Sequence, residues 1–182
     1  MKSWFKTYEL PTIVTNCSNN YGPYQFPEKL IPLVISNCLQ NKEIPIYGDG
    51  TNIRDWIYVE DHCNILFKII EKGKIGESYN IGGNQEISNI DLVKNICRIM
   101  DKEYPSDKSL KYQSLISFVK DRPGHDFRYA LNNKKIFRKI GWKAKVSLKS
   151  GLLKTFDWYY NNKQFFKSVP KKFYIKRLGL KI

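Results

Sequence analysis

The chain has 182 residues, of which 42% are hydrophobic and 14% aromatic, and its formal net charge is +14. This length suits one full domain and hardly two, and the apolar content favours a packed core over disorder. Residues 1–126 hold 15 Lys and Arg against 16 Asp and Glu, whereas residues 127–182 hold 16 against one, Asp157. The basic excess therefore belongs to the last third of the chain.

That basic third leaves two interpretations open. Its field could attract a nucleic acid, an anionic membrane or a phosphorylated ligand. It could equally be a lysine-rich solvated surface. We expect no nucleic-acid partner, because the sequence has no recognition-helix signature and no aromatic-basic RNA motif.

Membrane insertion, secretion and metal binding are not expected either. No apolar run approaches the ~18 residues of a membrane span, and the start "MKSWFKTYELPT" has no uninterrupted apolar core. The cysteines form no CxxC pair and only two histidines occur, which argues against a metal site and for free thiols in a reducing, cytoplasmic setting. These residues are Cys17, Cys38, Cys63, Cys97, His62 and His125.

Helices and strands are predicted to alternate along the chain. Residues 2–9 read as the last turns of a helix, followed by a β-branched strand, "TIVTNC", and a polar loop. A helix is predicted from about residue 27 to 41, with Pro27 at its first position. The later predictions are strands at 44–50, 52–61, 77–83 and 115–125, and helices at 60–71, 90–101, 132–141 and 147–162. This alternation predicts an α/β fold.

Two of these elements carry a distinct apolar pattern. In the strand "NIRDWIYVED", the alternation predicts that Ile53, Asp55, Ile57 and Val59 share one side. In the helix that follows, the predicted apolar stripe is Ile65, Leu66, Ile69 and Ile70. Ser88 or Asn89 is predicted to cap the helix at 90–101, and Gly141 to end the helix at 132–141.

The loop "SNNYGPYQFP" is the first candidate site. It delivers Asn19 and Asn20 toward a helix N-terminus, where backbone N–H groups favour anions. A solvated connection with a helix cap explains the same residues equally well.

Two signatures of dinucleotide-dependent chemistry are missing. No GxGxxG or GxxGxxG spacing occurs. Two YxxxK spacings exist, Tyr104–Lys108 and Tyr159–Lys163, but the first contains Pro105 and the second lies in the final helix. We interpret both as chance matches.

Four motifs resemble the carboxy-terminal half of the dTDP-glucose 4,6-dehydratases, a family of the extended short-chain dehydrogenase/reductase class. They are "TNCSNNYGPYQFPEKLIPL", "IPIYGDGTNIRDWIYVEDH", "GESYNIGGNQEISNIDLV" and "VKDRPGHDFRYA". The resemblance runs from about Trp4 to Asn162, and the "RLGL" near the end is also similar to the family. The "DRPGHD" loop favours this dehydratase over related epimerases and decarboxylases.

The resemblance implies roles for individual residues. It implies NAD as the cofactor, with Asn20 in contact with it, and dTDP-glucose as the substrate. Residues expected to bind the substrate are Asn19, Lys29, Leu30, Pro45, Ile46, Tyr47, Arg54, Asn89, Asp121, Arg122 and His125. Arg54 would hold the diphosphate bidentately, as a planar guanidinium can.

The resemblance also implies a fold and an activity. We expect an incomplete Rossmann-like fold, with a remnant of the NAD-binding domain at 1–26, an interleaved substrate-binding region at 27–162 and a basic tail at 163–182. The implied reaction converts dTDP-glucose to dTDP-4-keto-6-deoxyglucose and water. In the family the Tyr-Lys pair and the acidic pair for this chemistry precede the matching segment, so the resemblance implies no catalytic residue in this chain. A separately encoded amino-terminal half is one expectation, and a non-catalytic sugar-nucleotide binder is the alternative. The complete family enzyme is expected to be a homodimer.

Overall fold

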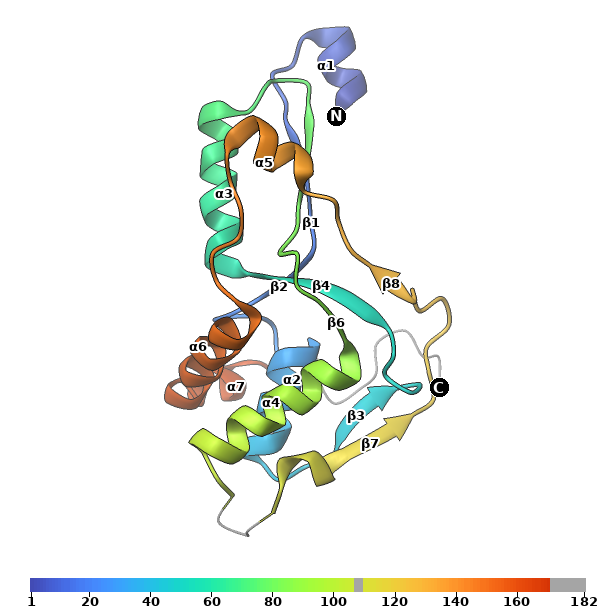
Figure 1. The fold of residues 1–182 in the computed structure, drawn as a ribbon, viewed down its shortest axis with the longest axis vertical. Coiled ribbons are helices and arrows are strands. Elements are labelled where there is room, and N and C mark those ends of the chain that lie inside the picture. The colour runs from blue at the N-terminus through green and yellow to red at the C-terminus, as the bar shows by residue number, and fades with distance from the viewer. Residues whose placement is uncertain (107–109, 171–182) are drawn as a thin grey trace. The chain divides into compact units, whose positions relative to one another are not determined.

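The computed structural model describes residues 1–106 and 110–170, and its helices and strands alternate as predicted (Figure 1). The α/β class is therefore confirmed. The helical elements are α1 (Lys2–Tyr8), α2 (Leu30–Leu39), α3 (Val59–Lys72), α4 (Asn89–Glu103), the 3-10 turn η1 (Tyr112–Leu115), α5 (Lys134–Ile140), α6 (Leu148–Asn161) and α7 (Gln164–Ser168). The strands are β1 (Val14–Cys17), β2 (Asn19–Tyr21), β3 (Ile44–Tyr47), β4 (Ile53–Tyr58), β5 (Ser78–Ile81), β6 (Glu86–Ser88), β7 (Ile116–Val119) and β8 (Arg128–Tyr129).

The strands of the described residues pair in three small sheets. β1 pairs with β5 and β3 pairs with β7, in both cases in parallel. The third sheet has the order β2-β4-β6, with β8 also beside β4, and its β2–β4 pair is parallel. Parallel neighbours need crossover connections, and helices such as α3 supply them.

The chain divides into two compact units, each built from three separate segments. The first unit comprises residues 1–21, 54–86 and 129–148, and the second comprises residues 22–53, 87–128 and 149–182. The predicted domain boundaries at residues 26 and 162 stay a prediction. The tail predicted at 163–182 lies outside the described residues from position 171 onward, and so does the "RLGL" motif.

The first unit has its core between α3, α5 and the β1–β5 pair. Ile65 and Ile69 lie one turn apart on α3 and are buried, while Leu66 is partly buried beside them. The prediction that Ile70 belongs to this stripe is wrong, because its side chain is 77% exposed. The buried cluster consists of Ile57, Ile65, Ile69, Tyr79, Ile81, Ile136, Ile140 and Trp142.

The second unit buries the facing sides of α2 and α4. Ile31, Val34 and Ile35 of α2 and Leu92, Val93 and Ile96 of α4 are each 2% exposed or less. The thiols of Cys38 and Cys97 are buried on the same two helices. The hydrogen bond to Cys97 and burial raise the pKa of the Cys38 thiol, so it stays protonated.

The ends of three helices test the predicted caps. Ser88 rather than Asn89 caps α4, since its hydroxyl accepts a hydrogen bond from the Asp91 N–H at 3.1 Å. Gly141 ends α5 in the left-handed conformation, as predicted. The prediction that Pro27 opens α2 is wrong, because the helix begins at Leu30 and Pro27 lies in the preceding turn.

None of the helices in the described part of the chain has both the length and the apolar character needed to cross a membrane. Within residues 1–106 and 110–170, no three His, Cys, Asp or Glu side chains gather as a metal site would require.

Candidate functional site

The two adjacent asparagines lie in a strand, and not in the loop that the sequence predicted. In the parallel β2–β4 pair, Asn19 stands opposite Trp56 and Asn20 opposite Ile57. Successive side chains of a strand point to opposite faces of the sheet. Asn19 and Asn20 therefore serve opposite faces, and the Asn20 amide donates a hydrogen bond to the Ser18 carbonyl at 3.2 Å.

Arg54 lies on the same face of the sheet as Asn19. It precedes Trp56, the partner of Asn19, by two residues in β4, so the side chains of these three residues share a face. The Arg54 side chain is largely buried, and the whole residue is 8% exposed. The structure thus brings together two of the predicted substrate residues and sets the predicted cofactor residue, Asn20, on the opposite face.

An aromatic cluster on this face was not predicted from the sequence. Tyr21 stands opposite Tyr58, and its ring lies edge-on to Trp56 and Tyr58, with centroids 6.1 and 5.6 Å away. Among the described residues, the Tyr21 hydroxyl and the Trp56 indole N–H are buried without a hydrogen-bond partner. Burial raises the pKa of Tyr21, so its phenol remains a proton donor. The only sequence signal for this cluster is that Tyr21 follows Asn19, and Trp56 follows Arg54, by two residues.

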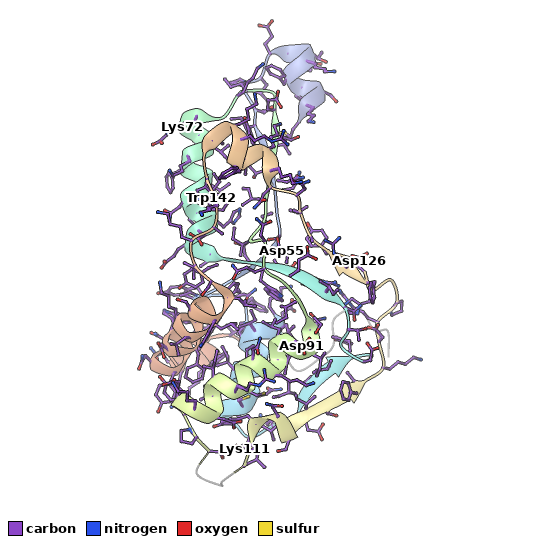
Figure 2. The ribbon with its side chains drawn as sticks, in the orientation of Figure 1. Asp55, Lys72, Asp91, Lys111, Asp126 and Trp142 are labelled. Carbon is purple, nitrogen blue, oxygen red and sulfur yellow. The ribbon has the colours of Figure 1, made fainter. Side chains whose placement is uncertain are left out.

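Asp55, labelled in Figure 2, lies between Arg54 and Trp56 in the strand and so anchors β4 from the other face. Its buried carboxylate accepts hydrogen bonds from the Gly83 N–H at 3.0 Å and the Gln85 N–H at 2.8 Å. A Cβ added at Gly83 would collide with the carbonyl oxygen of Trp56, so only glycine allows this approach of two backbones. Asp55 and Gly83 therefore hold in place the strand that carries Arg54.

Asp61, in the first turn of α3, plays a similar part. Its Oδ2 accepts hydrogen bonds from the backbone N–H groups of Lys145 and Val146, at 2.9 and 2.8 Å. Both buried acids of the first unit thus accept from backbone donors, which suits anchoring better than proton transfer.

In the second unit, predicted site residues gather where β3 and β7 end. The two strands lie side by side, with Tyr47 opposite Val119 (Figure 1). The loop after β7 places Asp121 and His125 here, with the His125 Nδ1 2.7 Å from Asp121 Oδ1. The rings of Tyr47 and His125 are perpendicular, with centroids 6.3 Å apart.

Asn89 lies beside the turn that follows β3. Its N–H donates to the Asn52 carbonyl, and the next N–H, of Ile90, donates to the Gly50 carbonyl, both at 3.0 Å. The Asp49 carboxylate shapes the turn by accepting from the Thr51 N–H at 2.9 Å and from its hydroxyl at 2.7 Å. The start of α4 is thereby tied to the end of β3.

The remaining predicted residues of the second unit differ in exposure. Ile46 is buried in β3, so its side chain belongs to the core, and its neighbour Pro45 is half-buried. Lys29 and Leu30 stand at the start of α2, where the exposed Lys29 ammonium lies 2.7 Å from Glu28. Arg122 is exposed in the loop after β7.

Only one of the two YxxxK spacings, Tyr159–Lys163, lies wholly within the described residues. Tyr159 is buried in α6, and its hydroxyl donates to the Gln25 carbonyl at 2.7 Å. Burial also raises its pKa, so Tyr159 fits a packing role and not that of a base. Lys108 of the other spacing lies outside the described residues.

The family model that matches this chain and two of its similar relatives are described as dehydratases. The family model described as GDP-mannose 4,6 dehydratase matches residues 1–155. A dTDP-glucose 4,6-dehydratase from Neisseria meningitidis is 51% identical over 182 residues, which cover 98% of this chain and 51% of that protein. The dTDP-glucose 4,6-dehydratase 1 of Escherichia coli K12 is 54% identical over 169 residues, covering 93% of this chain and 46% of that protein.

A solved structure also matches most of this chain and about half of its own length. The crystal structure of dTDP-glucose 4,6-dehydratase from Bacillus anthracis, in complex with NAD, superimposes with a TM-score of 0.81 and 46% identity. The match covers 91% of this chain and 50% of that one. The chain therefore spans about half the length of the curated relatives it matches.

Proposed function

Since this chain belongs to the family described as GDP-mannose 4,6 dehydratase, we propose that it supplies the sugar-nucleotide-binding, carboxy-terminal half of a dTDP-glucose 4,6-dehydratase. The observation that carries this proposal is identity of 51% to 54%, over at least 93% of this chain, with two proteins named for that activity. The enzyme as a whole would convert dTDP-glucose to dTDP-4-keto-6-deoxyglucose and water.

The face that holds Asn19 and Arg54 suits a nucleotide sugar. A guanidinium binds a diphosphate through two parallel N–H groups, and an amide donates to and accepts from sugar hydroxyls without adding charge. Burial strengthens both interactions, because the local dielectric constant is low. Trp56 and Tyr21 add two buried donors on this face.

The cluster at the ends of β3 and β7 suits the nucleotide. Tyr47 offers an aromatic face for a base, and Arg122 and His125 offer positive charge or N–H donors to phosphate oxygens. We assign Pro45, Ile46 and Asn89 to the same region, and Lys29 and Leu30 to the substrate as well. Ile46 would act through its backbone, because its side chain is buried.

The residues of this chain would supply only a small part of a cofactor site. Asn20, on the face opposite Asn19, would contact NAD, which supplies the hydride acceptor when it is bound. The sequence carries no glycine-rich dinucleotide loop. Most of the cofactor site would therefore come from the other half of a complete enzyme, which we expect to be a homodimer.

A chimera tests the proposal. This chain would replace the aligned half of the N. meningitidis relative, and turnover of dTDP-glucose and of GDP-mannose would be followed by chromatography. We expect conversion of dTDP-glucose alone by the chimera and of neither sugar by the isolated chain. A chimera that folds, retains NAD and turns over neither sugar would contradict the proposal.

A second function, sugar-nucleotide binding without turnover, is favoured by one observation. Tyr159, the tyrosine of the fully described YxxxK spacing, is buried and its hydroxyl is bonded to the Gln25 carbonyl, so it is used in packing. Binding of dTDP-glucose by the isolated chain, with an inactive chimera, would support this alternative.

A further inference from the structure

One hydrogen-bonded pair in the second unit holds a histidine in a defined orientation. Oδ1 of Asp121 lies 2.7 Å from Nδ1 of His125 and also accepts from the Arg122 N–H at 2.8 Å. The Asp121 side chain is 42% exposed, but the His125 side chain is only 6% exposed. The imidazole ring is therefore packed in place, while its carboxylate partner faces solvent.

Tyr47, the last residue of β3, and Gly48, which follows it, lie against this pair. A Cβ added at Gly48, whose φ is +58°, would lie 3.3 Å from Oδ2 of Asp121. Gly48 thus lets the backbone approach the carboxylate closely. On the other side the ring of Tyr47 stands perpendicular to that of His125. The imidazole is constrained by the carboxylate and by an aromatic edge.

The carboxylate decides which ring nitrogen carries the proton of the neutral imidazole. An ionised carboxylate only accepts hydrogen bonds, so Nδ1 must be the donor. The hydrogen bond to His125 within the described residues is at Nδ1, with none at Nε2. In the neutral ring Nε2 therefore has a lone pair available to take up a proton.

We propose that Asp121 is a positioning residue that directs proton uptake at Nε2 of His125 when a diphosphate anion binds at this end of β3 and β7. The inference rests on the proposed function, which brings a nucleotide diphosphate to this region. A proton from solvent forms the new Nε2–H bond, and that N–H then donates to a phosphate oxygen. In this role Asp121 acts through His125.

The charges around the ring are consistent with this role. The loop of His125 carries the charged residues Lys120, Asp121, Arg122 and Asp126, and the titratable Tyr47 of β3 has its ring beside the imidazole. The hydrogen bond from His125, together with that from the Arg122 N–H, lowers the pKa of Asp121, so the carboxylate stays charged throughout the neutral range. Arg122 and a protonated His125 would together present positive charge to a diphosphate.

Nuclear magnetic resonance can test the tautomer directly, because the 182-residue chain contains only two histidines. The ring nitrogen shifts at a pH where the ring is neutral should identify Nδ1–H at His125. In Asp121→Asn the fixed tautomer should be lost, since an amide can both donate and accept. His62 on α3 is the internal control. A wild-type His125 with its proton on Nε2 would overturn the inference.

Calorimetry with thymidine diphosphate tests the coupling to binding. In two buffers of different ionisation enthalpy, the wild-type chain should take up a proton on binding near pH 7.5, and affinity should fall as pH rises. Asp121→Asn should bind roughly tenfold more weakly, as expected for a charge-assisted hydrogen bond, and should lose the proton uptake.

Asp126→Asn removes the same charge from the same loop and is the matched control. It should keep both the tautomer and the proton uptake. Equal loss in both variants, or binding without proton uptake, would overturn the inference. If thymidine diphosphate does not bind at all, the ligand part of this inference fails, while turnover by the chimera still decides the proposed function and the nitrogen shifts still decide the role of Asp121.

Discussion

Two neighbouring residues of β2 face different environments because a strand alternates its side chains. Asn19 shares its face with Trp56 and Arg54, whereas Asn20 shares the opposite face with Ile57. The roles that the family resemblance implies for this pair, substrate for Asn19 and cofactor for Asn20, stay a prediction that the opposite faces allow to be tested residue by residue.

We predict that the two asparagines can be separated by mutation. In the chimera, Asn19→Ala should weaken the use of dTDP-glucose and leave NAD retention nearly intact, and Asn20→Ala should do the reverse. Each change removes a neutral hydrogen bond and leaves a partner unsatisfied, which costs about 1–3 kcal/mol, or roughly tenfold to a hundredfold in binding. Steady-state kinetics and the NAD content of the purified protein measure the two effects.

Asn16→Ala is the control for this pair. Its side-chain amide donates a hydrogen bond to the Asn80 side chain at 3.1 Å across the β1–β5 pair. The residue is exposed, so its loss should change the binding of neither ligand. Equal loss of both ligands in Asn19→Ala and Asn20→Ala would mean that β2 is only structural.

At the residue scale the sequence could name candidate residues but could not give their contacts. Tyr47, Asp121 and His125 were named from separate motifs, and the structure brings them together. Their contacts depend on the pairing of β3 with β7, which joins residues about 70 positions apart. Such a pairing has no local signal in the sequence, and neither has the approach of Gly83 to Trp56.

Among the elements, the longest were predicted well and the shortest were missed. α3, α4 and α6 have 14 or 15 residues, long enough for a helical period to be visible. β2, β6 and β8 have two or three residues, too few to show alternation. α7 lies in the segment predicted to be a tail.

β4 keeps the predicted alternation, with Asp55 and Ile57 on the face opposite Arg54 and Trp56. Residues 54–58 are all buried, so the strand is covered on both faces and alternation does not separate inside from outside. Val59, predicted to continue the strand, begins α3. The polar residues Arg54 and Asp55 occur in a buried strand because one belongs to the candidate site and the other anchors the backbone.

The contact between β4 and the loop after β5 yields a prediction about stability. Gly83→Ala should destabilise the chimera by at least about 2 kcal/mol, because the new methyl group meets the backbone of Trp56, which cannot move aside like a side chain. Urea unfolding followed by circular dichroism measures the change.

Gly141→Ala is the matched control on α5. It has a φ of +70° but nothing within 4 Å of the added Cβ, so only the left-handed backbone is penalised, by about 1 kcal/mol. Similar losses in both variants would mean that the loop after β5 can withdraw from β4.

At the scale of the whole molecule, the basic last third contains a packed helix and a terminal segment, and the two have to be tested separately. α7 is part of the folded second unit, because Phe166 is 9% exposed and its ring stacks on Tyr159 at 5.0 Å. Residues 171–182, which lie outside the described part, hold five Lys and Arg. The basic tail and the packed helix are therefore different targets for truncation.

We predict that removing residues 171–182 leaves the binding of dTDP-glucose unchanged, whereas removing 163–182 destabilises the protein by about 2 kcal/mol through the loss of Phe166 burial. Calorimetric titration and thermal unfolding of the two truncations measure these effects. Loss of sugar-nucleotide binding on removal of 171–182 alone would contradict this. Nucleic-acid binding by the tail would be recognised by its steep fall with salt.

The three-segment construction of each unit constrains how the chain can be made and cut. The first unit needs residues 129–148, so β1 and β5 can pair during synthesis well before α5 is available to cover them. Distant contacts of this kind slow folding and prolong the exposure of apolar surface. For the same reason a single proteolytic nick cannot release either unit intact, and a protease that removes one of them must cleave at several crossings.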